Sequence, residues 1–514
     1  MSDDRIHVPT ADLTPEQTKL GAKLDKRRRI VDAVWARLSL VRLLLAAVGV
    51  AWLFALPHPA LWKQTFIDEH ALSPAQVTVY YDWAQVFRAD RYLAEVEALR
   101  DANATWAERR DFLAASLRSA GVSAENTTSS VFARVTPPRS EGTEAILVSA
   151  NWLSRNGEVN VRGVALLLSL AEFLRGQNFW AFDIFLVSGD GYLDGLNDFT
   201  EHYAPRANIW TALNIDYPYH SFSHLGVFFE GTNGRLPNQD AVNSVLHVAK
   251  YGVWVDTTIH DLDERPQANY AFGAKALLDH FKYMALGRPS AAHGLLAQHR
   301  IDAVTLYGVP GEGPHGFHTM GRVVESTLRA YNNLLERLHA SFFFYLLPHP
   351  DYFLPVGHYL PAAVLLGASV TLGGFDCPDP LAGALWALPA FALGLLGWLT
   401  QSSLVSAGAM ILPKPKGDAR ASLASLAHLF YGALIPTLAM VNFPQAVLLA
   451  ALVILALAPL PRPVRASLVF LHPAVLEYYG GINLRAEWEQ FGNVAWPAIF
   501  AIWVPLQAVS DMLA

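Results

Sequence analysis

Two groups of side chains could take part in catalysis or metal binding. One consists of carboxylates around a single apolar run, and the other of histidines in a glycine-rich stretch. The carboxylates are Asp183, Asp190, Asp194 and Asp198, and the histidines are His293, His299, His315 and His318. Such groups bind zinc and act as general acids and bases. Both also have a plainer interpretation, because aspartate caps helices and histidine is common in surface loops.

Cysteine chemistry is excluded in the same part of the chain. The protein has one cysteine, Cys377, and it lies between two apolar runs further along the sequence. Residues 57–350 therefore form no internal disulfide and contain no thiol nucleophile.

The elements that would position these side chains alternate in type. Short β-rich runs and helical patterns follow one another as ILVSA, VALLLSLAEFL, FDIFLV, WTALNID, LGVFFEG and AVTLYG. This alternation predicts an α/β domain, with a mainly parallel sheet and helices on both faces. Functional residues then gather at the carboxyl ends of strands, expected at 149–154, 188–194, 216–220 and after Leu306. Apolar residues at helical spacing from Leu328 to Phe342 predict a long helix that leads out of the domain.

The remainder of the 514-residue chain is more apolar than a soluble domain. The chain is 52% hydrophobic and 16% charged, and most charges lie between about residues 57 and 350. We predict a basic tail (1–37), a transmembrane signal anchor (38–56), the α/β domain (57–350) and a C-terminal membrane bundle (351–514). The net charge of −7 argues against binding to nucleic acid.

The charges also predict an orientation. The basic run at 26–29 precedes the anchor, so the positive-inside rule places the N-terminus in the cytosol and the α/β domain in a lumen or outside. The sequons at Asn103 and Asn126 lie in the translocated part and are candidate glycosylation sites.

The C-terminal bundle is expected to contain six or seven spans. The apolar runs lie near 353–373, 381–408, 421–441, 444–460, 466–482 and 492–512. With seven spans in total, the basic loops at 414–420 and 462–465 would face the lumen, contrary to the positive-inside rule. A further span hidden in 381–412 would put both loops in the cytosol, so a total of eight is favoured.

Several segments resemble one known family and occur in its order. They are the basic anchor, FFEGTNGRLPNQD (228–240), AAHGLLAQHRIDAVTLYG (291–308), LLERLHASFFFYLLP (334–348) and NFPQAVLLA (442–450). Together they resemble the GPI-anchor attachment protein family. Members of this family are a subunit of the GPI transamidase of the endoplasmic reticulum. The resemblance implies a multi-pass membrane protein that works with other subunits, among them a cysteine-protease-like catalytic subunit. We interpret the chain as a non-catalytic subunit that helps to bind the GPI lipid and the C-terminal signal of the proprotein.

The α/β domain of that family is similar in turn to the di-zinc aminopeptidases. The positions matched to metal-site residues are Asn151, Val159 or Asn160, Asp190 with Gly191, Asp216 and His318. A valine or a neutral amide cannot bridge two cations, so we expect a degenerate site with no metal and no cofactor. In the alternative hypothesis the domain is itself a metal-dependent peptidase-like or amide-forming enzyme. That hypothesis requires Asp190, Asp216 and His318 to converge on one centre.

Two further segments are candidates for binding the GPI lipid. In WKQTFIDEHAL (62–72), the resemblance implies a headgroup site, in which Asp68 and Glu69 would accept hydrogen bonds from the ethanolamine ammonium. The same segment also fits an exposed helix start with acidic residues in its first turn. The candidate residues are Thr65, Phe66, Asp68 and Glu69 here, and Trp496, Pro497 and Trp503 in the last span. Alternatively, the spans only pack against one another through small residues.

Overall fold

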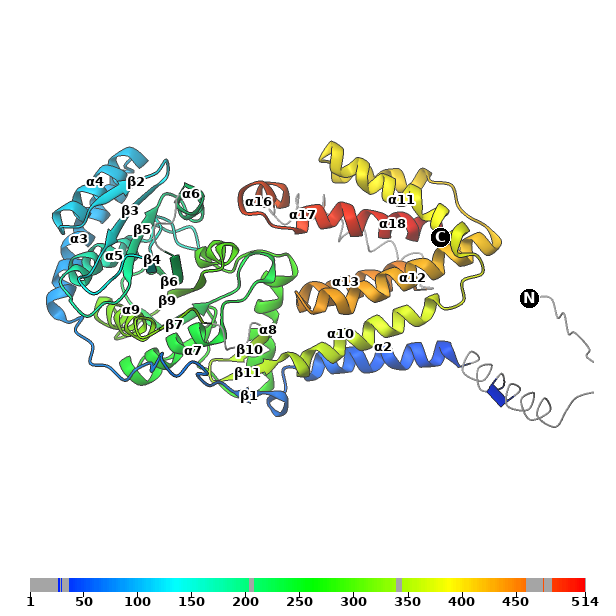
Figure 1. The fold of residues 1–514 in the computed structure, drawn as a ribbon, viewed down its shortest axis with the longest axis horizontal. Helices are drawn as coiled ribbons and strands as arrows, with labels where there is room; N and C mark the ends of the chain where they lie inside the picture. The colour runs from blue at the N-terminus through cyan, green and yellow to red at the C-terminus, as the bar shows by residue number, and fades with distance from the viewer. Residues whose placement is uncertain are drawn as a thin grey trace, which may run out of the picture.

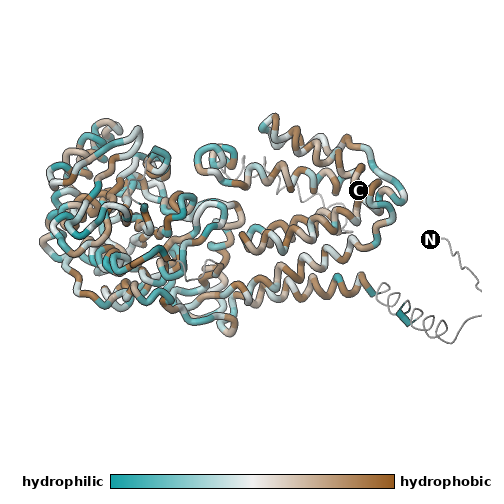
Figure 2. Tube along the Cα trace, viewed as in Figure 1, coloured by the Kyte–Doolittle hydropathy of each residue, from teal (hydrophilic) through white to brown (hydrophobic). Residues whose placement is uncertain are grey.

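The computed structural model describes residues 37–202, 208–338, 344–458 and 483–513, together with residues 26, 27, 29 and 475. An α/β domain forms one end of the molecule and a bundle of helices forms the other (Figure 1). The bundle helices are predominantly apolar, whereas polar and apolar residues alternate along the domain (Figure 2).

An eight-stranded sheet forms the centre of the α/β domain. Strands β5, β4, β6 and β9 are parallel neighbours. Strand β3 runs antiparallel to β2 and β5, and β7 runs antiparallel to β9 but parallel to β8. In sheet order the strands are β2 (Ala124–Asn126), β3 (Ser130–Val135), β5 (Asp183–Gly189), β4 (Glu144–Ser149), β6 (Asn208–Asp216), β9 (Asp302–Pro310), β7 (Phe222–Phe228) and β8 (Thr257–Ile259). The predicted α/β fold is confirmed, as a mixed sheet that is parallel at its centre.

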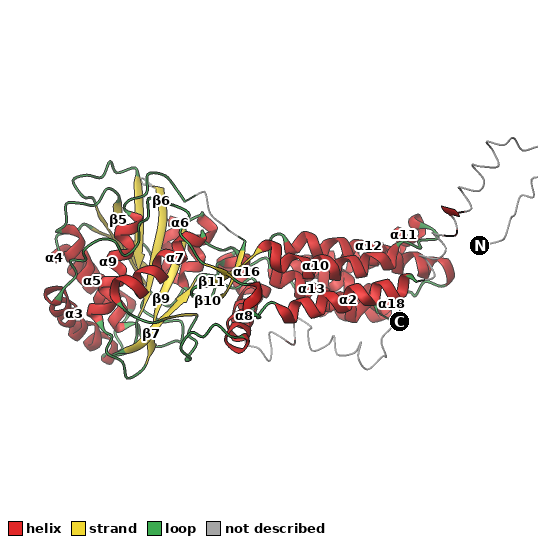
Figure 3. Cartoon of the chain, turned by 90° about the horizontal axis from the view of Figure 1, so that it is seen from below, coloured by secondary structure: helices red, strands yellow, loops and turns green. Residues whose placement is uncertain are grey.

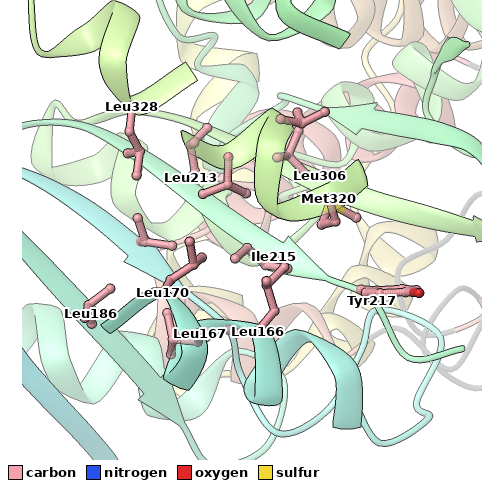
Figure 4. Close-up of a cluster of buried hydrophobic side chains, with 14 of the residues drawn as sticks. Leu166, Leu167, Leu170, Leu186, Leu213, Ile215, Tyr217, Leu306, Met320 and Leu328 are labelled. Atoms are coloured by element: carbon pink, nitrogen blue, oxygen red, sulfur yellow. The ribbon is translucent and has the colours of Figure 1, made fainter. Parts of the chain in front are cut away.

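Helices cover both faces of this sheet. Leucines of α5 (Val161–Arg175) point toward Leu186, Leu213 and Ile215 on one face (Figure 4). The opposite face packs against α6 (Asp194–His202) and the short helix η5 (Ala292–His299). The remaining helices of the domain are α3 (Trp83–Asp101), α4 (Trp106–Ser119), α7 (Gln239–His247), η4 (Val248–Val253), α8 (Tyr270–Ala285) and α9 (Phe317–Tyr331). The central strands β4, β5, β6 and β9 are buried along nearly their whole length, which is the pattern of a sheet covered on both faces.

The long helix predicted up to Phe342 ends earlier. Helix α9 stops at Tyr331, and the chain returns as strand β10 (Tyr345–His349). The side-chain oxygen of Asn332 accepts a hydrogen bond from the Ala181 N–H at 2.6 Å, which fixes the chain just after the helix. Leu335, expected on the buried side, is 91% exposed. The apolar residues that follow Tyr331 therefore do not continue helix α9, although they are spaced as in a helix.

A small sheet and a set of asparagines join the domain to the bundle. Strand β11 (Tyr352–Pro355) pairs with both β10 and β1 (Lys63–Gln64), next to the first bundle helices. Asn442 donates to the Met284 carbonyl at 2.8 Å, and Asn493 donates to the Leu286 carbonyl at 3.0 Å. Asn233 donates to the Gly492 carbonyl and accepts from the Val494 N–H. We call Asn233, Asn442 and Asn493 the asparagine junction.

Among the described residues, five helices are long and apolar enough to cross a membrane. They are α2 (Leu38–Ala55), α10 (Val356–Thr371) with its extension to Gly374, α11 (Pro380–Thr400), α12 (Gly417–Ala439) and the segment Ala495–Leu513, formed by α17 (Ala495–Ala498), η9 (Ile499–Trp503) and α18 (Val504–Leu513). Helix α13 (Phe443–Leu457) is apolar but shorter. Small residues bring these helices close, since a Cβ at Gly394 would overlap the carbonyl oxygen of Phe500.

The run at 381–412 does not form two long helices. Helix α11 ends at Thr400, Gln401 has a positive φ of 50°, and the short 3₁₀-helix η7 (Ser403–Ile411) follows. A 3₁₀-helix of that length rises roughly 18 Å, well below the ~30 Å of a bilayer core. The expected span at 466–482 lies outside the described residues, so the total number of spans stays a prediction.

Glu325 fixes the segment before α3 onto α9. Its fully buried carboxylate accepts the backbone N–H groups of Tyr80, at 2.8 Å to one oxygen, and of Tyr81, at 2.6 Å. We predict that Glu325→Ala lowers the free energy of unfolding by about 2–4 kcal/mol, because two N–H groups lose their acceptor. Thermal unfolding of the purified protein tests this. Glu325→Gln, which keeps one acceptor, should lose less, and the exposed Glu158→Ala should change nothing; equal midpoints for all three variants would contradict the prediction.

Candidate functional site

The carboxyl ends of β4, β5 and β6 meet, as the sequence predicts for a functional edge. The chain after β4 lies against the end of β5, where the Trp152 N–H donates to the Gly189 carbonyl at 2.8 Å. The buried side chain of Asn160 joins this loop to β6. Its amide nitrogen donates to the carbonyls of Asn151 at 3.1 Å and Ile215 at 2.9 Å, and its oxygen accepts from the Tyr217 N–H at 2.8 Å. Asn160 thus ties three backbone segments together with one amide.

Asp216, at the end of β6, is also fully engaged. One carboxylate oxygen accepts from the Ser154 hydroxyl and the other from the Arg155 N–H at 3.0 Å. Burial raises the pKa of Asp216 to about 6, although both of these hydrogen bonds favour the charged form. The retained aspartate therefore serves the loop as an acceptor.

The side chain of Arg155 fills the space beside Asp216. Its guanidinium donates to the Asp261 carboxylate at 2.6 Å and to the Tyr283 hydroxyl at 2.8 Å, and it lies 4.2 Å from the centre of the Phe228 ring. A fixed cation at this position opposes a second cation nearby. Sequence reasoning missed Arg155, because its partners lie more than 70 positions further along the chain.

Asp190 and Val159 line a separate cleft of about 250 Å³. There Asp190 pairs with Arg109 at 3.0 Å, and the Arg109 guanidinium lies 4.7 Å from the centre of the Trp152 ring. The Asn151 amide donates to the Tyr192 carbonyl at 2.6 Å. Asp190 therefore has a cationic partner from α4, distinct from the partners of Asp216.

His318 does not join these residues through any contact in the structure. It stacks on Trp83, at the start of α3, with ring centres 4.8 Å apart. His293 bonds to the Thr305 hydroxyl at 2.8 Å, and burial lowers its pKa to about 4. Within the described residues, no three His, Cys, Asp or Glu side chains are placed to hold a metal ion. Since Asn160 and Asp216 already use their polar atoms within the protein, these residues do not fit a di-zinc centre.

The carboxylates around β5 also have separate partners. Asp183 pairs with Arg134, and Asp198 accepts from the Ser129 N–H and pairs with His202. They form no common site.

A buried ionisable cluster was missed by the sequence analysis. One oxygen of Glu230 accepts from His260 at 2.7 Å and from His280 at 2.6 Å, and all three side chains are fully buried. Burial alone would raise the pKa of Glu230, but the two histidines hold it well below its usual range. Glu230 lies in the FFEG sequence, which carried no sign that residues 30 and 50 positions away would be its partners. The cluster connects the end of β7 to α8.

The candidate headgroup segment is fixed to α7 through its backbone. Asp240 accepts the N–H groups of Asp68 and Glu69, and Asn243 donates to the Phe66 carbonyl at 2.8 Å. Phe66 is 45% exposed, Asp68 is exposed and Thr65 is partly exposed. The backbone is thus held while polar side chains reach the surface.

The last span borders an apolar cavity of about 410 Å³. Its wall includes α13, the end of α8 and residues 494–503, with Pro497 and Trp503 among them. The indole N–H of Trp503 is buried and has no hydrogen-bond partner within the described residues. Trp496 instead donates to Gln401 at 2.8 Å and does not line the cavity. Thr65, Phe66, Asp68 and Glu69 do not line it either, so the two candidate lipid-binding groups form no common cavity.

Both sequon asparagines are exposed. Asn103 lies in a turn with a positive φ of 47° at the rim of the Asp190 cleft, and Asn126 ends the edge strand β2. Their glycosylation stays a prediction.

The Asn160 hydrogen bonds predict the effect of restoring a carboxylate. We expect Asn160→Asp to lower the free energy of unfolding by about 2–4 kcal/mol, because an acceptor would then face the carbonyls of Asn151 and Ile215. This loss of unfolding free energy should shrink below about pH 5, where the protonated carboxyl of the variant can again donate a hydrogen bond. Thermal unfolding at several pH values measures both effects. Asn333→Asp, at an exposed position, is the control, and an Asn160→Asp protein as stable as this control would refute the role of the amide.

Comparison with known proteins identifies the family. The family described as Gaa1-like, GPI transamidase component, matches residues 127–387, about half of the chain. The GPI transamidase component GAA1 of Saccharomyces cerevisiae is 29% identical over 377 residues, covering 69% of this chain and 61% of that protein. The gaa1 component of Schizosaccharomyces pombe is 27% identical over 388 residues, covering 68% and 65%. The match thus spans less than two thirds of either relative.

Solved structures with distant similarity include a glutaminyl cyclase from Porphyromonas gingivalis, at 18% identity and a TM-score of 0.30, covering 48% of this chain and 97% of the cyclase. A zinc aminopeptidase from Bacillus subtilis is 11% identical with a TM-score of 0.26, covering 39% and 50%. The matches to the family and to the two yeast proteins carry the assignment: the chain belongs to the Gaa1-like family of GPI transamidase components.

Proposed function

We propose that this protein is a non-catalytic subunit of the GPI transamidase complex that holds the GPI lipid in its helical bundle and helps to present the proprotein. The observation that carries the proposal is the apolar cavity lined in part by Trp503, whose buried indole N–H has no hydrogen-bond partner within the described residues. It is supported by the names of the two yeast relatives, which are GPI transamidase components.

The cavity suits a lipid with an acceptor group near its acyl chains. Leu448, Leu449 and Leu452 supply one apolar wall and Ile499 and Ile502 the other. Acyl chains would bury against these side chains, with a gain proportional to the area removed from water. A buried N–H without a partner is unfavourable, and an ester or phosphate oxygen would satisfy it. An apolar wall with one donor therefore fits the acyl-glycerol region of a GPI lipid.

The headgroup would be recognised elsewhere on the same protein. The side chains of Asp68, Glu69 and Thr65 can accept hydrogen bonds from an ethanolamine ammonium or glycan hydroxyls, and the exposed Phe66 ring offers an apolar surface beside them. Since Asp240 already holds the backbone of this segment, binding would order only side chains.

The nucleophile for transamidation would come from a partner. The chain has a single cysteine, Cys377, which lies between α10 and α11 rather than in the α/β domain. A cysteine-protease-like subunit would form the thioester, and this chain would contribute binding surfaces. In this proposal the protein resides in the endoplasmic reticulum membrane, with a cytosolic N-terminus and a luminal α/β domain.

The pseudo-enzyme assignment predicts that the purified full-length protein contains no stoichiometric zinc and shows no aminopeptidase turnover. The reason is that Asn160 and Asp216 use their polar atoms in protein hydrogen bonds and that Arg155 holds a positive charge beside them. Elemental analysis and a peptide-release assay measure this. One or two zinc ions per chain, lost on Asp216→Ala, would support the alternative of a metal-dependent enzyme and overturn the assignment.

The lipid proposal predicts a difference between two buried tryptophans. Trp503→Phe removes the indole N–H but keeps an aromatic side chain, so retention of labelled GPI lipid by the affinity-purified complex should fall about three- to tenfold, as expected for the loss of one hydrogen bond. Trp496→Phe should leave retention unchanged, because that N–H bonds to Gln401 outside the cavity.

A second variant tests the apolar part of the site. Leu452→Trp should exclude acyl chains by filling the cavity while the partner subunits still co-purify. If Trp503→Phe and Leu452→Trp both retain the lipid like the unmodified protein, the cavity is not the GPI site.

A further inference from the structure

Helix α8 lies across the ends of membrane-spanning helices. At its first residue, the Tyr270 hydroxyl donates to the Phe54 carbonyl in the last turn of α2, at 2.9 Å. Near its other end, Phe281 packs against Phe443, the first residue of α13, with ring centres 5.7 Å apart. In Figures 1 and 3, α8 stands between the α/β domain and the bundle and runs across the direction of the bundle helices. It therefore lies where these helices leave the bilayer.

Two of the three faces of α8 are occupied by protein. One face packs on the domain, through Phe272 against His349 and through His280 against Glu230. A second face meets the bundle side, with Gly273 against Trp62 and Leu277 in the cluster of bundle residues. The third face carries the exposed residues of the helix, spaced by four, three and four positions: Ala271, Lys275, Leu278 and Lys282.

The exposed face has the composition of a helix at a lipid surface. At about 100° per residue, Leu278 falls on the side of this face nearer the bundle, whereas Lys275 and Lys282 fall nearer the domain. Leu278 is 69% exposed, and so is Phe54 in the adjoining turn of α2. Across a bilayer surface, apolar acyl chains lie on the inner side and charged headgroups on the outer side. The exposed face has the same order, with a large aliphatic side chain next to the ends of the spans and lysines on the outer side. Tyr270, also partly exposed, fits the aromatic belt at the same level.

We propose that α8 is an interfacial helix whose exposed face lies in the headgroup layer of the bilayer. Leu278 enters the boundary of the acyl chains, and the Lys282 ammonium lies at the level of the lipid phosphates. The Lys275 ammonium pairs with the Glu264 carboxylate on the outer side of the same face. The occupant of this face is the lipid surface itself, since the faces toward protein are already filled. The inference holds whatever ligand the cavity between α13 and the last span takes.

The single native cysteine makes a direct test practical. In a Cys377→Ala background, a nitroxide label is placed at Leu278→Cys in the full-length protein, which is reconstituted into phosphatidylcholine vesicles. Its accessibility to dissolved oxygen and to a water-soluble nickel chelate is measured by electron paramagnetic resonance. Leu335→Cys, in the α/β domain and 91% exposed, is the aqueous control, and Leu388→Cys, in α11 and 60% exposed, is the lipid control.

Leu278→Cys should be more accessible to oxygen than to the chelate, as Leu388→Cys is, and Lys282→Cys should lie between the two controls. A label at Leu278→Cys as accessible to the chelate as Leu335→Cys would overturn the proposal. Protection of that label from both reagents would also overturn it, because protein rather than lipid would then cover the face.

Discussion

Asn160 holds the carboxyl edge of the sheet together through three hydrogen bonds from one neutral side chain. Strand ends that converge in this way leave backbone carbonyls and N–H groups that need partners once buried. Here an amide supplies donors and acceptor together, and Ser154 and the Arg155 backbone satisfy Asp216. The side chains of Asn160 and Asp216 thereby find all of these partners within the protein.

The same arrangement explains what the sequence could and could not predict. The alternation of apolar runs reports burial on two faces of a sheet, so the α/β domain and its functional edge were predictable. That Asn151, Val159 and Asn160 bring no charge to a cation follows from their side chains, and the absence of a metal there stays a prediction. The contacts beside Asp216 were not predictable, because Arg155, Asp261 and Tyr283 meet only through the folded chain.

The predictions that failed have local physical causes. Periodicity continued past Tyr331, but the Asn332 side chain bonds to Ala181, and β10 then completes a small sheet. Loop charges favoured a further span hidden in 381–412, yet α11 ends at Thr400, the backbone turns at Gln401 and only a short 3₁₀-helix follows. In the last span, composition singled out Trp496 and Trp503 equally. Only the contacts distinguish an indole N–H that is bonded from one that has no hydrogen-bond partner within the described residues.

The asparagine junction has a mechanical consequence. Its hydrogen bonds, from Asn442 to Met284, from Asn493 to Leu286 and between Asn233 and residues 492–494, link neutral groups. Neutral hydrogen bonds carry no net charge for salt to screen and do not titrate with pH. Part of the link between the α/β domain and the bundle is therefore insensitive to ionic strength and pH, in contrast to the ion pair between Arg288 and Glu487 at the same junction.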